Sequence, residues 1–321
     1  MGKLRSRQWC AAAVVAAAFL ALTASAGAAG SSDVYNATTA LTPNVASLGF
    51  EATSTSEFGD HINLGGTNRV LGEITVIMSD WALYADYSTD ARYAGNNSTW
   101  SHPITVNVYS SHLGANGAPD TLLATKMQNV TIPWRPAADP TCAGGTAWRA
   151  GDGQCYNGIA FPATFDLSSL NVTLPNDVIV SIAYNTADYG VTPIHVVGPY
   201  NSLNVGVPSS QPVTVGSDVS VDRVFANSTW AGFYTDGGTA GVGIFREDTN
   251  WTPNGTVAFK ITASPALVGP PTSKDQCKDG GWKTFNNPSF KNQSQCEKYV
   301  KEHQHDGDDD HHGGGDEHGD H

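Results

Sequence analysis

Histidine and acidic side chains are concentrated in one stretch, HQHDGDDDHHGGGDEHGDH, which runs from His303 to His321. Imidazole nitrogens and carboxylate oxygens are the ligands that bind Zn²⁺, Ni²⁺ and Cu²⁺ in proteins. The stretch has no apolar side chain that could pack, so we expect a disordered tail that binds divalent metal flexibly. An equally open alternative is a tail that only solubilises the protein or spaces it from a cell wall. The metal-ligand candidates are His303, His305, Asp306, Asp308, Asp310, His311, His312, Glu317, His318 and His321.

The same stretch nearly fits a calcium-binding loop. If Asp306 is the first position, Asp308 and Asp310 fall at the third and fifth and Glu317 at the twelfth. However, His311 stands where such a loop needs a turn-forming glycine. We therefore interpret the calcium match as a chance result in a segment built from Asp, His and Gly. The sequence requires no cofactor elsewhere.

A second stretch, WALYADYSTDARYAGNNSTW (81–100), combines aromatic rings with polar side chains. Exposed Trp and Tyr rings can stack on the C–H faces of sugars, because they combine an apolar body with a polar edge. The sequence therefore predicts a glycan-binding loop, although these rings could instead pack beneath a long loop. The ligand-binding candidates are Trp81, Tyr84, Tyr87, Tyr93 and Trp100.

Catalytic signatures are absent from the sequence. It contains no G-x-S-x-G elbow, no H-E-x-x-H helix and no phosphate-binding P-loop. The histidines outside the tail are His61, His102, His112 and His195. A catalytic triad can form from residues distant in sequence, so an exported hydrolase remains an alternative. We favour a protein that is not an enzyme.

The charge balance argues against nucleic acid as a partner. The formal net charge is −13, and removal of residues 1–26 with Lys3, Arg5 and Arg7 would make it −16. Phosphate binding requires clustered Lys and Arg, which this chain does not have.

The elements that must position these residues are strands. In ITVNVYSS, apolar side chains at Ile104, Val106 and Val108 alternate with polar ones, and the segments 72–81, 177–185 and 256–261 show the same period. Period-two alternation over five to eight residues is typical of strands with one buried face. Many such strands without intervening helices predict an all-β antiparallel sandwich of two sheets, resembling a jelly roll.

Four cysteines remain if Cys10 is removed with the leader. We favour the near-neighbour pairs Cys142–Cys155 and Cys277–Cys296, because each closes a short loop and neither has the spacing of a zinc site. The segment around the second pair carries its own aromatic residues and a potential helix, NQSQCEKYVKEH. Some thirty residues bury too little to fold alone, so we expect its disulfide to be required.

The beginning of the chain predicts export. Lys3, Arg5 and Arg7 precede an uncharged apolar run, which the small-residue stretch TASAGAAG follows. This order is typical of a cleavable signal peptide, so we expect a secreted, extracellular protein with no membrane insertion after cleavage.

Two segments resemble known proteins. PTSKDQCKDGGWKTFNNPSFKNQSQCEKYV (271–300) resembles a C-terminal segment of secreted proteins of high-GC Gram-positive bacteria, and this resemblance implies export. More weakly, VNVYSSHLGANGAPDTLLAT (106–125) resembles bacterial surface β-sandwich domains, which implies a module for attachment or display.

The expected organisation is a signal peptide (1–26), a β-sandwich domain (27–264), a linker (265–274), a small disulfide-stapled segment (275–302) and the His/Asp-rich tail (303–321). We expect surface attachment or binding of an extracellular polysaccharide. The alternatives are extracellular metal binding through the tail and, less favoured, hydrolysis.

Overall fold

The computed structural model describes residues 30–38, 43–208 and 212–303. This part of the chain divides into two compact units between Leu267 and Val268, a boundary that lies inside the expected linker. The first unit is built from strands and the second from short helices. The expected signal peptide and all of the tail beyond His303 lie outside the described residues.

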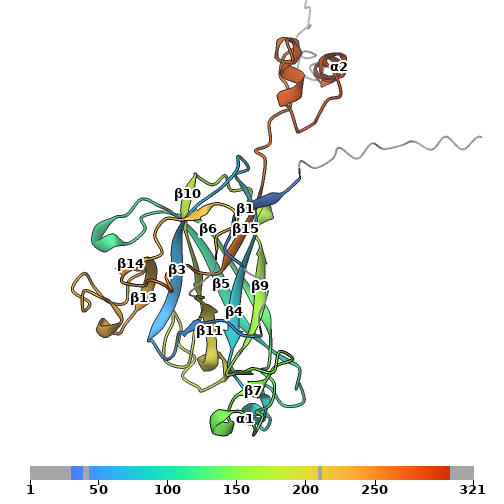
Figure 1. Ribbon diagram of the computed structural model, residues 1–321. Helices are drawn as coiled ribbons and strands as arrows, with labels where there is room; N and C mark the ends of the chain where they lie inside the picture. Colours follow the sequence, from blue (N-terminus) through green and yellow to red (C-terminus); the bar gives the residue numbers. More distant parts are fainter. Residues whose placement is uncertain (1–29, 39–42, 209–211, 304–321) are drawn as a thin grey trace, which may run out of the picture. The chain divides into compact units, whose positions relative to one another are not determined.

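The first sheet of the strand-built unit has six antiparallel strands (Figure 1). Its longest strand, β4, pairs with β9 on one side. On the other side β4 pairs first with β15 and then, near its end, with β11. The strands are β1 (Ser32–Asn36), β15 (Phe259–Ser264), β4 (Val70–Asp80), β9 (Ile159–Asp166), β11 (Leu203–Gly206) and β2 (Ser47–Gly49).

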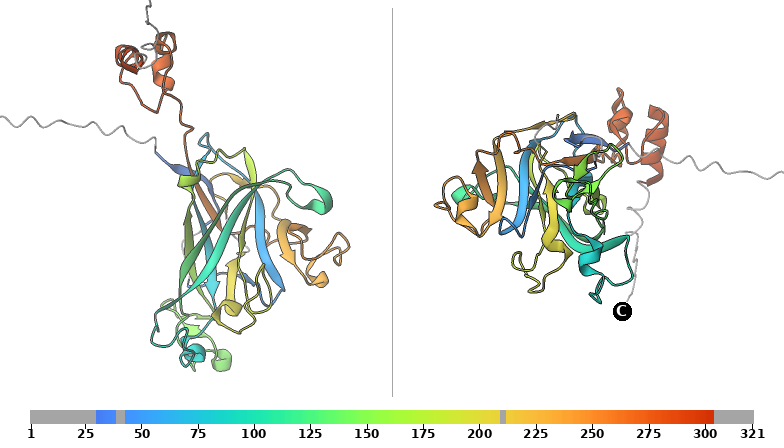
Figure 2. Two further views of the ribbon diagram at one scale, coloured as in Figure 1. Left: turned by 180° about the vertical axis from the view of Figure 1, so that it is seen from behind. Right: turned by 60° about the horizontal axis from the view of Figure 1, so that its bottom comes forward.

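The second sheet faces the first and has seven antiparallel strands (Figures 1 and 2). Six of them follow one another across the sheet, and the short β12 (Ser217–Asp218) pairs with β3 as well. In order they are β14 (Arg246–Thr249), β13 (Arg223–Ser228), β3 (Thr55–Asn63), β10 (Asp177–Ala183), β5 (Thr99–Ser110) and β6 (Leu122–Pro133).

Eight of these strands have the connectivity of a jelly roll, as the sequence predicts. One sheet contains the order β1, β15, β4, β9, and the other contains β3, β10, β5, β6. Taken along the chain, the eight strands pass from one sheet to the other at every connection except the β5–β6 hairpin. Two interlocked Greek keys give this pattern.

The core lies between the two sheets. On β5, Ile104, Val106 and Val108 are fully buried, which confirms the predicted inward face. Phe259 and Ile261 of β15 are fully buried in the same apolar cluster from the opposite sheet. Removal of these side chains from water is the main favourable contribution to the stability of the sandwich.

Two connections carry further short elements at one end of the sandwich (Figure 1). The segment after β4 contains the single helical turn α1 (Tyr84–Tyr87). The segment after β6 contains the two-stranded ribbon of β7 (Trp148–Arg149) and β8 (Cys155–Tyr156). The predicted Cys142–Cys155 disulfide closes this ribbon.

The second unit, from Val268 to His303, has a small core around the predicted Cys277–Cys296 disulfide. Both sulfurs are buried with Phe290 and Val300, and three further aromatic side chains pack against them. The predicted helix forms as α2 (Gln293–His303). Asn292 begins it, because its Oδ1 accepts the N–H of Gln295 at 2.9 Å.

Among the described residues, no helix is long and apolar enough to cross a membrane.

Candidate functional site

A cleft of about 560 Å³ opens beside β2 and β11 of the first sheet. Its lining combines two indole rings, Trp81 and Trp251, with amide and hydroxyl side chains. None of the residues that line it is charged. The polar side chains are Ser47, Thr53, Asn201, Ser202, Asn204 and Asn254.

Trp81 follows the last residue of β4 and is held from several directions. Its N–H donates to the carbonyl of Ser202 at 3.0 Å, and its carbonyl accepts from Nε of Arg135 at 2.9 Å. The indole Nε1 donates to Oγ of Ser79 at 3.0 Å. A Cβ atom at Gly158 would lie 2.3 Å from Cδ1 of the ring, so the ring edge rests where only glycine leaves room. The side chain is nevertheless 41% exposed, so part of it is open to a ligand.

The loop that the Cys142–Cys155 disulfide closes contacts Gly158, the residue against which the Trp81 ring lies. Nε1 of Trp148 on β7 donates to the carbonyl of Gly158 at 2.8 Å. The Trp148 ring also packs on Tyr156 of β8, with centroids 5.9 Å apart. Because Cys142 and Cys155 join the loop covalently, the ribbon holds Gly158 and, through it, Trp81.

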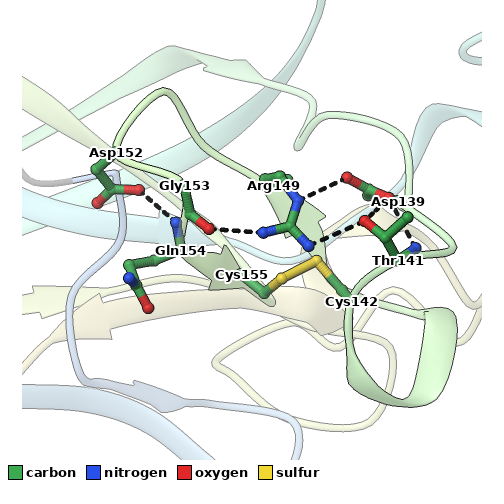
Figure 3. Close-up of a disulfide and its surroundings, with 8 residues drawn as sticks. All are labelled: Asp139, Thr141, Cys142, Arg149, Asp152, Gly153, Gln154 and Cys155. Carbon is green, nitrogen blue, oxygen red and sulfur yellow. Dashed lines mark hydrogen bonds and ion pairs between the residues drawn. A yellow bond between two sulfur atoms is a disulfide. The ribbon is translucent and has the colours of Figure 1, made fainter.

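Arg149 links the segment before Cys142 to the segment before Cys155 by hydrogen bonds (Figure 3). Its guanidinium donates to Oδ2 of Asp139 at 3.0 Å, to Oγ1 of Thr141 at 2.9 Å and to the carbonyl of Gly153 at 2.6 Å. The charge of Arg149 and the hydrogen bonds from Thr141 lower the pKa of Asp139, with the Thr141 bonds the larger cause. The loop that the disulfide closes is therefore held by these hydrogen bonds as well as by the covalent bond.

Trp251 reaches the cleft from the connection between β14 and β15. Its Nε1 donates to Oδ2 of Asp248 at 2.8 Å. Its ring packs on Phe58 and Phe233, with centroids 5.3 and 5.5 Å away. The inner part of this indole is thus anchored in the core, while another part lines the cleft.

Three asparagine amides are oriented by one hydrogen bond each. Oδ1 of Asn201 accepts a backbone N–H at 2.9 Å, and Nδ2 of Asn254 donates to a backbone carbonyl at 2.7 Å. Nδ2 of Asn204 donates to Oγ of Ser47 at 3.1 Å. Among the described residues, no hydrogen bond engages the other polar atom of these amides. The cleft therefore offers both an amide donor and amide acceptors to a ligand.

Most of the aromatic candidates from the 81–100 loop pack on one another instead of lining the cleft. The Tyr84, Tyr87, Tyr93 and Trp100 rings surround Trp134, with centroids 5.7, 5.8, 5.8 and 5.9 Å from its ring. The expectation of an exposed ring is wrong for Trp100, which is 3% exposed because it lies on the inward face of β5. Of the five candidates, the structure brings only Trp81 to the cleft.

A buried carboxyl group, Asp80, fixes the start of this loop. Its Oδ1 accepts the N–H of Ala82 and its Oδ2 accepts Nε1–H of Trp100, both at 3.1 Å. Burial raises the pKa of Asp80 to about 8, against the opposing effect of these hydrogen bonds. Asp80 does not line the cleft, and its hydrogen bonds hold Ala82 and Trp100 on either side of it.

The histidines of the sandwich do not form a catalytic triad in the part of the chain that the structure describes. His61 and His112 each contact one carboxylate, Asp177 at 3.1 Å and Asp120 at 2.5 Å. Among the described residues no hydrogen bond joins either ring to a serine hydroxyl, and Nε2 of His102 lies 2.7 Å from the carbonyl oxygen of Asn185. His195 is exposed.

Of the metal-ligand candidates, the described residues include only His303, at the end of α2. Its Nδ1 lies 2.8 Å from the carbonyl oxygen of Tyr299, and its ring stacks on the Tyr299 ring at 3.9 Å. Within residues 30–38, 43–208 and 212–303, no three His, Cys, Asp or Glu side chains are grouped to hold a metal ion. The other tail candidates, from His305 to His321, lie outside the described residues.

Sequence reasoning missed Trp251 and the asparagines of the cleft. Trp251 and Asn254 stand in DTNWTPNG, which reads as a polar turn, and Asn201 and Asn204 lie about fifty residues before it. The burial of Trp100 could have been predicted from the sequence. Trp100 is an even number of residues from Ile104, Val106 and Val108, so its side chain points to the same face of the strand.

No family model, curated protein or solved structure matches this chain.

Proposed function

We propose that this chain is an exported, non-enzymatic attachment protein that binds an uncharged saccharide in the cleft lined by Trp81 and Trp251. The observation that carries the proposal is the combination of two anchored indoles with oriented amides in one uncharged cleft. Aromatic rings stack on the apolar faces of sugars, and amide groups exchange hydrogen bonds with their hydroxyls. An ionic ligand would lack a charged partner there.

Preorganisation supports binding in this cleft. Trp81 is held by its backbone, by its ring N–H and by the room that Gly158 leaves. Trp251 is held by its ring N–H and by core aromatic rings. A ligand would therefore lose little binding free energy to ordering these side chains.

Export is supported by the signal-peptide pattern of residues 1–26 together with the two disulfides. Disulfides form and persist in oxidising compartments outside the cytosol.

Retention on insoluble polysaccharides tests the proposal. The mature chain, residues 27–321, would be incubated with cellulose, chitin, xylan and purified cell wall. Trp81→Ala should weaken retention about tenfold or more, which corresponds to a loss of about 1.4 kcal/mol or more of binding free energy. Trp230→Ala is the matched control, because Trp230 is 53% exposed and does not line the cleft. Equal effects of the two substitutions would contradict the assignment of the cleft.

Two further arms separate the alternatives. A chain truncated after Ser264 should be retained like the full chain, with or without EDTA. Retention of the full chain alone, abolished by EDTA, would assign binding to the C-terminal region and its metal. Release of soluble sugars from the polysaccharide would instead favour a hydrolase.

A further inference from the structure

A second cleft, of about 410 Å³, is lined in part by the turn between β2 and β3, and other residues of the same turn line the first cleft. One of its walls is the loop that contains Asp188, Tyr189 and Pro193. Asn227 of β13 and Thr229 contribute to its lining from another part of the chain.

The two clefts are adjacent. Thr53 lines the first and Ser54 lines the second, and consecutive α-carbons are only about 3.8 Å apart. Ala52 and Thr53 line the first cleft and Ser54 lines the second, and we call this segment of small side chains, Ala52–Ser54, the ridge between the clefts.

This ridge is fixed to the elements around it. The carbonyl of Ser54 accepts the N–H of Thr229 at 3.0 Å, and the carbonyl of Thr53 accepts Oγ–H of Ser228 at 2.9 Å. On the side of the loop, Oε2 of Glu51 accepts the N–H of Asp188 at 3.3 Å. The relative position of the two clefts is therefore set by the fold.

The second cleft also combines an aromatic ring with amide and hydroxyl groups, although it contains no indole. It offers the ring of Tyr189, the amide of Asn227 and the hydroxyls of Ser54, Ser56 and Thr229. Asp188 is the one charged residue in its lining, and it is exposed at the edge of the loop.

We infer that the two clefts form one extended binding site, so that the ligand is an internal stretch of a linear, uncharged polysaccharide that crosses the Ala52–Ser54 ridge. This inference rests on the proposed function. A site for a terminal sugar would use the first cleft alone, whereas an extended site gains contacts as the saccharide lengthens across the ridge.

A length series tests the extended site. Dissociation constants would be measured by calorimetry for cello-, chito- and malto-oligosaccharides of two and of six units, with the mature chain. In the series that binds, the six-unit oligosaccharide should bind at least about tenfold more tightly than the two-unit one. Tyr189→Ala and Asn227→Ala should each reduce this ratio while leaving the two-unit affinity unchanged. Tyr299→Ala is the control, because Tyr299 is a partly exposed tyrosine of α2 that lines neither cleft, and it should change neither affinity.

The outcomes distinguish this inference from the proposed function. Equal affinity for two and six units would overturn the extended site and leave the saccharide cleft intact. A length dependence that survives both Tyr189→Ala and Asn227→Ala would also overturn it. If no oligosaccharide of either length binds, the proposed function fails and the inference fails with it.

Discussion

Replacing Asp60 by asparagine should stabilise the sandwich, and the gain should grow as the pH rises. Asp60 lies on β3 with its side chain in the core, where it is 1% exposed. Its Oδ2 accepts the N–H of Val257 at 3.3 Å, whereas Oδ1 has no hydrogen-bond partner among the described residues. Burial is the largest cause that raises the pKa of this carboxyl well above its usual range, and the charge of Asp218 adds to it.

The sign of the pH dependence follows from this shift. The unfolded chain ionises Asp60 near pH 4, whereas the folded chain keeps it protonated to a higher pH. Between these two pKa values folding takes up one proton. Asp60 alone should therefore lower the free energy of unfolding by about 1.4 kcal/mol for each unit of pH increase. The Asp60→Asn variant keeps the size of the side chain and has no proton to lose, so this slope should disappear.

Urea unfolding of both proteins between about pH 5 and pH 7 would measure the effect. The difference in unfolding free energy should widen with pH by up to about 1.4 kcal/mol per unit. Asp80, whose pKa is also raised, is present in both proteins and cancels from the difference. Asp188→Asn is the control, because Asp188 is exposed, and its difference should stay constant. A difference for Asp60→Asn that does not change with pH would refute the reasoning.

Three other predictions concern the site and its supports. Gly158→Ala places a Cβ 2.3 Å from Cδ1 of Trp81, so it should displace the ring and weaken retention on polysaccharide about tenfold; unchanged retention would contradict the proposed support. Paired Cys142→Ser and Cys155→Ser substitutions should lower the stability of the 135–155 loop by about 3 kcal/mol, measured as faster proteolysis there with the sandwich intact. Burial lowers the pKa of His102 to about 4, so folding opposes its protonation, and the free energy of unfolding should fall as the pH drops from about 6.5 to about 4. His102→Phe should remove this contribution to the pH dependence. If denaturant titrations show the same fall in unfolding free energy below about pH 6.5 for both proteins, the prediction is contradicted.

Much of the sandwich was predictable because the sequence patterns that indicate it span only a few neighbouring residues. Alternation on β5 and β15 identifies buried faces within a few residues, and the short loops between cysteines favour the two disulfides that form. The alternation predicted for β10 is wrong in one respect, because β10 is buried on both faces. The extra strands β11 and β13 were not predicted, because β11 has only 4 residues and β13 carries three apolar residues in a row, Val224 to Ala226, without alternation. Pairing with β4 and β3 is what defines them. Such pairings depend on the packing of the whole core.

The candidate site was only partly predictable for a similar reason. The rings of the 81–100 stretch could form either an exposed binding surface or a small core. They form a small core because they pack on Trp134, which lies outside that stretch. The cleft instead combines Trp81 with Trp251, which is 170 residues further along the chain. Only the jelly-roll connectivity brings them to one cleft.

The antiparallel pairing of β15 with β4 has a mechanical consequence for a protein that attaches through this cleft. Ser264 pairs with Val70 and Phe259 pairs with Val76, while Trp81 follows the far end of β4. If tension enters through the chain after Ser264 and leaves through a ligand at Trp81, it pulls the two strands past each other along their length. The ladder of hydrogen bonds is then loaded in shear, with all bonds sharing the force, instead of being opened one after another. Because resistance to forced unfolding depends on the unfolding rate, this geometry should slow the rupture of the sandwich under flow.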